Sequence, residues 1–174
     1  SGPAHSAARE AADELAQRWG VGVDLWSATS YKRLREDALA ADRYNRLHPG
    51  NQPRTPLVTS LLADGDGPVV AVTDYMTMVP DQVSRWVGRP FRTLGTDGFG
   101  RSDTRPALRR FFEVDAGHVV VAVLAALAEV GDVDPSVVAE AIDLHGIDPE
   151  APDPGRHDTG PAPGHGVGHP TSPE

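Results

Sequence analysis

The residues with the clearest potential for chemistry follow a short apolar run, in the segment Leu94-Gly-Thr-Asp-Gly-Phe-Gly-Arg-Ser-Asp103. Its closely spaced glycines could turn backbone amides toward an anion, with arginines nearby. The glycine spacing, however, matches neither the dinucleotide-binding nor the phosphate-loop pattern. We therefore expect a structural loop in which Gly98, Gly100 or both have positive φ, and in which Asp97 or Asp103 accepts hydrogen bonds from turn amides. Anion binding is the alternative. The residues concerned are Gly95, Gly98, Gly100, Arg101, Arg105, Arg109 and Arg110.

The histidines are the other candidates for chemistry. No serine is placed beside them as a nucleophile by spacing, and the chain has no cysteine, which excludes disulfides and thiolate zinc sites. His118 stands at the start of an apolar run, where we expect a hydrogen-bonding imidazole. His48 and His145 are also expected to be structural. His157, His165 and His169 lie in a Pro/Gly-rich segment without a regularly spaced acidic ligand, so we expect a solvated tail rather than a metal site.

The composition restricts the class of protein. A length of 174 residues suits one domain with its own core, and a net charge of −9 argues against nucleic acid and anionic membranes as partners. The longest apolar run, Val119 to Ala128, is shorter than the roughly 20 residues of a membrane helix. No secretory signal is visible. We expect a cytoplasmic protein.

The hydrophobic pattern predicts the elements that must position these residues. A helix with an inner face of Ala8, Ala11, Ala12, Leu15 and Trp19 should end at Gly20, and a strand should follow from Val21 to Leu25. Thr29 or Ser30 should cap a helix with an inner face of Tyr31, Leu34, Ala38 and Ala41. Strands are expected over 69–72 and 91–94, separated by a helix over 74–87 that Asp74 caps and Pro80 kinks or splits.

The segment from His118 to Val130 is rich in valine, which favours a strand. We predict a buried helix instead, because the segment is long, Asp115 can cap it and Gly131 can end it. Asp134, Pro135 and Gly146 should frame the last helix. Strands separated by helices predict a three-layer α/β/α fold with a mostly parallel sheet over residues 1–150. Residues 151–174 form a Pro/Gly/His-rich tail that we expect to be disordered.

The glycine loop also carries a family resemblance. The word Leu94-Gly-Thr-Asp-Gly-Phe-Gly-Arg-Ser-Asp103 resembles the signature of the C-terminal, transketolase C-terminal-like domain of homodimeric pyruvate dehydrogenase (acetyl-transferring) decarboxylating components. Further segments similar to that family bring the resemblance to roughly residues 4–147. They are Asp24-Leu-Trp-Ser-Ala-Thr-Ser30, Arg43-Tyr-Asn-Arg-Leu-His-Pro49, Val70-Ala-Val-Thr-Asp-Tyr-Met76, Val79-Pro-Asp-Gln82 and Phe112-Glu-Val-Asp115.

The resemblance implies a non-catalytic domain of an enzyme that decarboxylates pyruvate on thiamine diphosphate with magnesium. It implies no catalytic, cofactor-binding or metal-binding residue in this chain, and an isolated chain without activity. The Gly65-Asp-Gly67 segment lacks the family's paired asparagines, and we interpret it as a turn. The glycine loop is then expected to face another domain or subunit, through Thr96, Asp97, Phe99, Gly100, Arg101, Ser102 and Asp103.

The implied partners are upstream catalytic domains of the same polypeptide, the second subunit of a homodimer, and the lipoyl acyltransferase component. The resemblance implies that the family's first strand of this domain would lie ahead of Ser1. We therefore expect a sheet that lacks this strand, and a chain that self-associates or borrows a strand or its own tail to cover the exposed edge. Alternatives are a stand-alone small-anion-binding or interaction module, and the same domain of another 2-oxoacid dehydrogenase or a transketolase.

Overall fold

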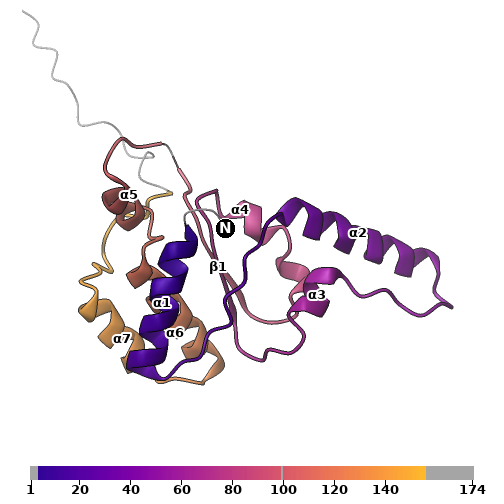
Figure 1. Cartoon of the computed structure of the whole chain (residues 1–174), viewed down its shortest axis with the longest axis horizontal. Coiled ribbons are helices and arrows are strands. Elements are labelled where there is room, and N and C mark those ends of the chain that lie inside the picture. Colours follow the sequence, from indigo (N-terminus) through magenta and orange to yellow (C-terminus); the bar gives the residue numbers. More distant parts are fainter. Residues whose placement is uncertain (1–3, 99, 156–174) are drawn as a thin grey trace, which may run out of the picture.

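The computed structural model describes residues 4–98 and 100–155. Two strands, β1 (Val69–Val72) and β2 (Phe91–Leu94), pair in parallel, with Val69 opposite Phe91. The helices are α1 (Ala4–Trp19), α2 (Tyr31–Leu47), α3 (Leu57–Leu61), α4 (Met78–Asp81), the 3-10 turn η1 (Ser84–Trp86), α5 (Arg105–Phe111), α6 (Ala116–Val130) and α7 (Pro135–Leu144). In Figure 1, α1, α6 and α7 lie on one side of the strands, and α2, α3 and α4 on the other. The predicted α/β class with parallel strands is confirmed.

Side chains and glycines fix the helix ends where the sequence predicted. The Ser30 hydroxyl accepts a hydrogen bond from the Arg33 N–H at 3.2 Å and caps α2. Asp115 and Asp134 cap α6 and α7 in the same way, through the N–H groups of residues 118 and 136. Gly20 and Gly131 follow α1 and α6 with φ of 65° and 87°, a conformation that costs glycine little.

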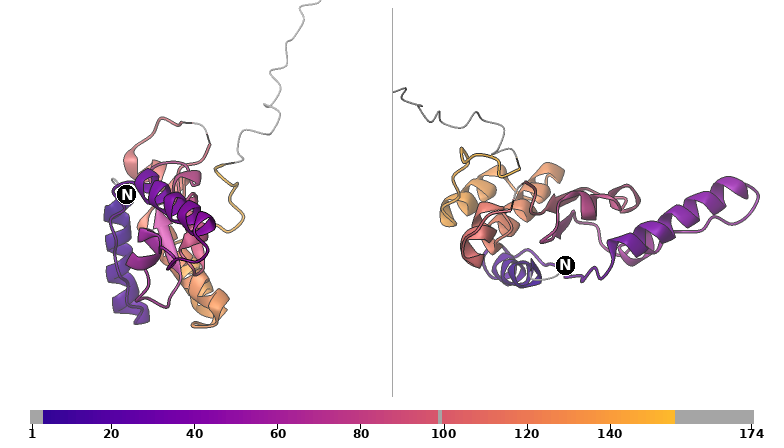
Figure 2. Two further views of the ribbon diagram at one scale, coloured as in Figure 1. Left: turned by 90° about the vertical axis from the view of Figure 1, so that its right-hand side faces the viewer. Right: turned by 90° about the horizontal axis from the view of Figure 1, so that it is seen from above.

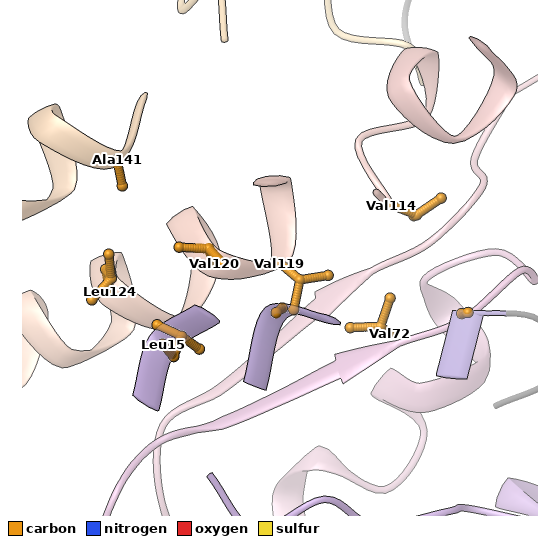
Figure 3. Close-up of a cluster of buried hydrophobic side chains, with 9 residues drawn as sticks. Leu15, Val72, Val114, Val119, Val120, Leu124 and Ala141 are labelled. Carbon is orange, nitrogen blue, oxygen red and sulfur yellow. The ribbon is translucent and has the colours of Figure 1, made fainter. Parts of the chain in front are cut away.

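The main core lies between α1, α6, α7 and one face of the strands (Figure 3). Leu15 of α1 and Val120 and Leu124 of α6 are almost wholly inaccessible to water. Val119 of α6 and Val72 of β1 belong to the same cluster. Because α6 is covered by a helix on two sides and by the strands, nearly all of its faces meet protein. This burial outweighs the strand preference of its valines, and the predicted helix is confirmed.

The buried face of α1 is rotated slightly from the predicted one. Ala4, Ala7, Ala11 and Leu15 are buried, whereas Ala8, Ala12 and Trp19 are only partly so. In α2 the prediction was closer: Ala38 and Ala41 are buried, and Tyr31 and Leu34 partly buried. Figure 2 shows that much of α2 extends away from the rest of the described chain.

The predicted strand from Val21 to Leu25 is wrong. The segment is extended, but among the described residues no strand pairs with it, and Val23 and Leu25 are 39% and 41% exposed. Alternation of apolar and polar residues indicates which side chains of an extended segment lie on its apolar side. A strand also needs a neighbouring backbone for its hydrogen bonds, and the pattern carries no information about that neighbour.

The predicted helix over 74–87 begins later and is divided. It consists of α4 and η1. The predicted division is present, but it lies after Asp81 and not at Pro80, which is buried inside α4. The cap at Asp74 is wrong, because the Asp74 carboxylate instead accepts a hydrogen bond from the Ala4 N–H at 2.9 Å and ties α1 to the end of β1. The apolar segment after Pro56, which the sequence left unassigned, is α3.

One helical stretch, Arg105–Val130, is long and apolar enough to cross a membrane when judged by length and composition alone. In the structure it is divided into α5 and α6 by a corner at Glu113, which has a φ of 57°. The apolar side chains of α6 belong to the main protein core, together with those of α1, α7 and β1. The stretch is therefore weak evidence for a membrane span. The predicted tail from Arg156 onward lies outside the described residues.

Candidate functional site

The first half of the glycine loop is fastened to the segment after β1. Thr96 donates two hydrogen bonds, from its N–H to the Tyr75 carbonyl at 2.9 Å and from its hydroxyl to the Asp74 carbonyl at 2.8 Å. A Cβ on Gly95 would lie 2.6 Å from the Tyr75 carbonyl oxygen, closer than real Cβ contacts occur. Gly95 is therefore required by the close approach of two backbone segments.

Asp97 adds a second fastening point, on the residue that precedes α4. Its carboxylate accepts hydrogen bonds from the Thr77 N–H at 3.0 Å and from the Thr77 hydroxyl at 2.6 Å. Asp103 accepts a hydrogen bond from the Thr104 N–H at 2.7 Å, at the start of α5. Both acidic residues therefore bind turn amides, as predicted. Thr96 and Asp97 therefore hold the loop to the segment after β1 and are not part of an exposed binding surface.

The second half of the loop is exposed. Gly98 and residues 100–103 are open to solvent, and Phe99 lies outside the described residues. Gly98 has a φ of 99°, which confirms the predicted positive φ at this residue, while Gly100 has none. A Cβ on Gly98 would lie 2.9 Å from the Pro154 carbonyl oxygen, because the segment after α7 returns to the loop. Gly100, Arg101, Ser102 and Asp103 are the part of the predicted site that is presented outward.

The loop and the four arginines do not converge on one point. Arg110 donates hydrogen bonds to the carbonyls of His145 and Gly146, at 3.0 Å and 2.6 Å, and pairs with Asp115 at 3.4 Å. Arg109 reaches the Ser6 hydroxyl, and the Arg101 guanidinium lies over the Phe111 ring. The glycines thus have backbone roles, and three of the four arginines contact protein groups. The alternative of anion binding gains no support from this geometry.

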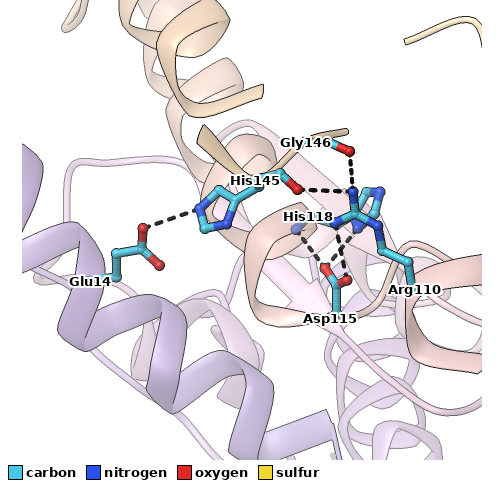
Figure 4. Close-up of polar contacts among 6 residues, drawn as sticks. All are labelled: Glu14, Arg110, Asp115, His118, His145 and Gly146. Atoms are coloured by element: carbon cyan, nitrogen blue, oxygen red, sulfur yellow. Dashed lines mark hydrogen bonds and ion pairs between the residues drawn. The ribbon is translucent and has the colours of Figure 1, made fainter. Parts of the chain in front are cut away.

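A polar cluster joins the ends of α5, α6 and α7 (Figure 4). Asp115 accepts hydrogen bonds from the His118 N–H at 2.9 Å and from the His118 ring Nδ1 at 2.7 Å. Partial burial on its own would raise the pKa of the Asp115 carboxyl. The hydrogen bonds from His118, with a smaller contribution from the Arg110 charge, lower that pKa from 3.8 to about 2. The predicted hydrogen-bonding role of His118 is confirmed.

His145 extends this cluster to α1. Its ring Nε2 lies 3.1 Å from the Glu14 carboxylate, at ion-pair distance but without the geometry of a hydrogen bond. The ring also covers Gly117 of α6, where a Cβ would lie 2.9 Å from it. The His48 ring nitrogen lies 2.9 Å from the Tyr44 carbonyl, and the ring stacks on Tyr44. His48, His118 and His145 therefore all have structural contacts.

The described residues do not fit a thiamine diphosphate site. Gly65-Asp-Gly67 lies in the connection between α3 and β1, after a turn at residues 62–64, and Arg89 donates hydrogen bonds there to the carbonyls of Gly67 and Leu62. The Arg89 guanidinium fills the space beside Gly65, with one of its nitrogens 2.5 Å from the position of a Cβ on that glycine. Among the described residues, no group of three or more histidine, aspartate or glutamate side chains could hold a metal.

Sequence reasoning missed several contacts that shape the site. Thr77 with Asp97, Arg89 with Gly67, and Arg110 with the end of α7 each join residues at least 20 positions apart. Local spacing contains no signal for such pairs. It also missed an open, largely apolar groove of about 550 Å³ between α2 and α4, lined by residues that include Leu39, Met76, Met78 and Trp86.

Comparison with known proteins gives the family. The chain is 52% identical over 146 residues to the pyruvate dehydrogenase E1 component of Pseudomonas aeruginosa, covering 83% of this chain and 17% of that protein. It is 48% identical to those of Mycobacterium tuberculosis (94% and 18%) and Escherichia coli K12 (84% and 16%). The chain thus spans about one sixth of the length of these relatives. Residues 1–115 match the family described as the transketolase-like TK C-terminal domain. Together with the parallel strands and the fastened glycine loop, this match shows that the chain belongs to the transketolase-like TK C-terminal domain family.

Proposed function

We propose that the chain acts as the C-terminal domain of a pyruvate dehydrogenase E1 enzyme and serves domain packing and dimer assembly rather than chemistry. The relatives support the parent enzyme, since each is a pyruvate dehydrogenase E1 component. In this proposal, upstream domains hold thiamine diphosphate and magnesium and decarboxylate pyruvate. The acetyl group then passes to a lipoyl acyltransferase component, and the enzyme works in the cytoplasm.

The observation that carries the packing role is the division of the glycine loop. Its first half is fixed by Thr96 and Asp97, whereas its second half, from Gly100 to Asp103, is exposed and contributes little to the fold around it. A rigid base under an exposed, polar tip is suited to contact a neighbouring surface without rearrangement. Arg101 supplies a fixed positive charge there, held over the Phe111 ring with 4.5 Å between the guanidinium carbon and the ring centroid.

The test replaces the matching segment of the Pseudomonas aeruginosa relative with this chain and measures dimerisation and pyruvate oxidation of the chimera. The paired substitutions Arg101→Ala and Ser102→Ala are then compared with Arg9→Ala and Gln17→Ala, a matched exposed pair on α1. The α1 pair should change the stability of the isolated chain by no more than about 0.5 kcal/mol, and the loop pair, which loses the contact of Arg101 with the Phe111 ring, by no more than about 1 kcal/mol.

In the chimera, the loop pair should lower both the dimer fraction and the activity, and the α1 pair should change neither. A loop variant as dimeric and active as the unmodified chimera would contradict the packing role. A chimera that folds but is inactive without any substitution would contradict the parent assignment.

A further inference from the structure

The groove between α2 and α4 is lined mainly by apolar side chains that water still reaches. They include Leu39 of α2, Met78 of α4 with Met76 just before it, and Trp86 of η1. Leu39, Met76 and Met78 are 37%, 52% and 71% exposed. Figure 1 shows α4 beside the first turns of α2. The groove volume of about 550 Å³ lies in the range of small-molecule sites. Because the groove is open, a ligand in it keeps one side in water, which suits a molecule with a charged end.

The side of the groove that carries the two methionines has a fixed backbone. Thr77, which stands between them, donates hydrogen bonds to the Asp97 carboxylate from its N–H at 3.0 Å and from its hydroxyl at 2.6 Å. The methionine side chains are unbranched and can adapt their shape to a partner. A fixed backbone with adaptable side chains can therefore pack against a chain of methylene groups.

The groove carries one positive charge that the protein does not compensate. Its lining includes Arg35 of α2 and Arg85 of η1, and none of its described lining residues is acidic. Arg85 is paired with Asp42 at 2.6 Å and lies over the Trp86 ring. Arg35 is exposed and has no partner within the described part of the chain. The groove thus combines an apolar surface with a single free guanidinium.

The carboxylates that follow Arg35 along α2 are engaged elsewhere. Glu36 pairs with Arg33 at 3.1 Å. Asp37 accepts a hydrogen bond from the Leu57 N–H at 2.7 Å. The charge of Arg35 is therefore available to an anion from outside the chain.

From this combination we infer that the groove binds a free amphipathic carboxylate, with its carboxylate group on Arg35 and its acyl chain against the two methionines and Leu39. A guanidinium binds a carboxylate through two parallel charge-assisted hydrogen bonds. Each methylene group that leaves water for the apolar lining adds to the affinity. The inference uses neither the exposed half of the glycine loop nor any chemistry of the parent enzyme, so it goes beyond the proposed function.

The two methionines make the groove directly observable. The chain has no others, so both signals in an NMR spectrum of the chain with isotope-labelled methionine methyl groups come from the groove. Decanoate, kept well below the concentration at which it forms micelles, should shift both signals in a saturable way with a dissociation constant below about 1 mM. The probes 1-decanol and decyltrimethylammonium have the same alkyl chain with a neutral and a positive end. They should bind at least about five-fold more weakly.

Two pairs of variants separate the charge from the apolar contact. Arg35→Gln should weaken decanoate binding about five-fold and change the affinity for 1-decanol by less than about two-fold. Arg43→Gln, at an exposed arginine about two turns further along α2 and outside the groove lining, is the matched control and should change neither affinity. Leu39→Gln should weaken both probes, whereas Leu47→Gln, at an exposed leucine of the same helix outside the lining, should weaken neither.

Methionine signals that do not move with decanoate would overturn the inference. So would equal affinity for decanoate and 1-decanol, or an equal loss in Arg35→Gln and Arg43→Gln, because either result would mean that Arg35 does not recognise the carboxylate. A response to phosphatidylglycerol vesicles without a response to monomeric decanoate would indicate a membrane surface instead and would also overturn it. Circular dichroism of each variant shows that its helices are intact. All of these variants leave the glycine loop unchanged, so a negative result here does not bear on the proposed packing role.

Discussion

Asp115 combines two stabilising roles that can be separated by experiment. Its carboxylate caps α6 through the His118 N–H, and it also accepts a hydrogen bond from the ring of His118, whose side chain is only 12% exposed. A helix cap contributes about 1 kcal/mol, and a hydrogen bond to a charged group about 1.5 kcal/mol or more. Asp115→Ala is therefore expected to lower the free energy of unfolding by about 2 to 3 kcal/mol at neutral pH.

The lowered pKa of Asp115 gives an independent value for the part that depends on charge. A fall in the pKa of Asp115 from 3.8 to about 2 on folding corresponds to a contribution of about 2 kcal/mol to the free energy of unfolding. Because the folded pKa is the lower one, this stability is fully present above pH 4 and is lost as the pH falls toward 2. Asp115→Asn keeps an oxygen for the His118 N–H but cannot become charged, so it isolates the charge.

The assay is urea unfolding of the wild type and of Asp115→Asn at a series of pH values from 7 to 2.5. The difference in free energy of unfolding should be about 2 kcal/mol at pH 7 and should shrink steadily below pH 4. Glu140→Gln, at an exposed carboxylate without a partner, is the matched control and should show little difference at any pH. A difference for Asp115→Asn that stays constant down to pH 2.5 would refute the electrostatic account.

Three further predictions follow from the backbone and the turns. Gly98→Ala should destabilise the chain by about 1 kcal/mol or more, whereas Gly100→Ala, with no positive φ and open space around it, should leave the melting temperature nearly unchanged. Glu113→Gly should stabilise by up to about 1 kcal/mol, because Glu113 holds a left-handed conformation, and a lower melting temperature would contradict this. The isolated chain should bind no thiamine diphosphate with magnesium, because Arg89 fills the space beside Gly65, and micromolar affinity in calorimetry would contradict this.

The elements that could be predicted from sequence are those whose cause is local. Ser30, Asp115 and Asp134 cap their helices because each side chain needs only an N–H two or three residues away. Gly131 ends α6 for a comparable reason. The helix α6 itself was predicted against the strand preference of its valines, and it forms because α1, α7 and the strands surround it.

The errors concern residues whose role depends on a distant partner. Asp74 has the residue type and position of a helix cap, but its carboxylate binds the Ala4 N–H, 70 residues away. The segment from Val21 to Leu25 alternates as a strand does and has no strand beside it among the described residues. For the glycine loop, the sequence predicted the glycine conformation and the hydrogen-bonding aspartates. The loop is divided into a fixed and an exposed half because Thr77 and Tyr75 hold its first half. No local sequence pattern connects these two residues to the loop.

The packing of α1 against α6 has a consequence for the order in which the chain folds. Among the described elements these helices form the largest contact, yet about one hundred residues separate them in sequence. At typical rates of synthesis of about 5–20 residues per second, α1 would leave the ribosome several seconds before its partner exists. Contacts this distant also slow folding, because a long loop must close before they form. During that interval the apolar face of α1, including Leu15, lacks its main partner, so folding of this domain is expected to finish after translation of α6 rather than proceed helix by helix.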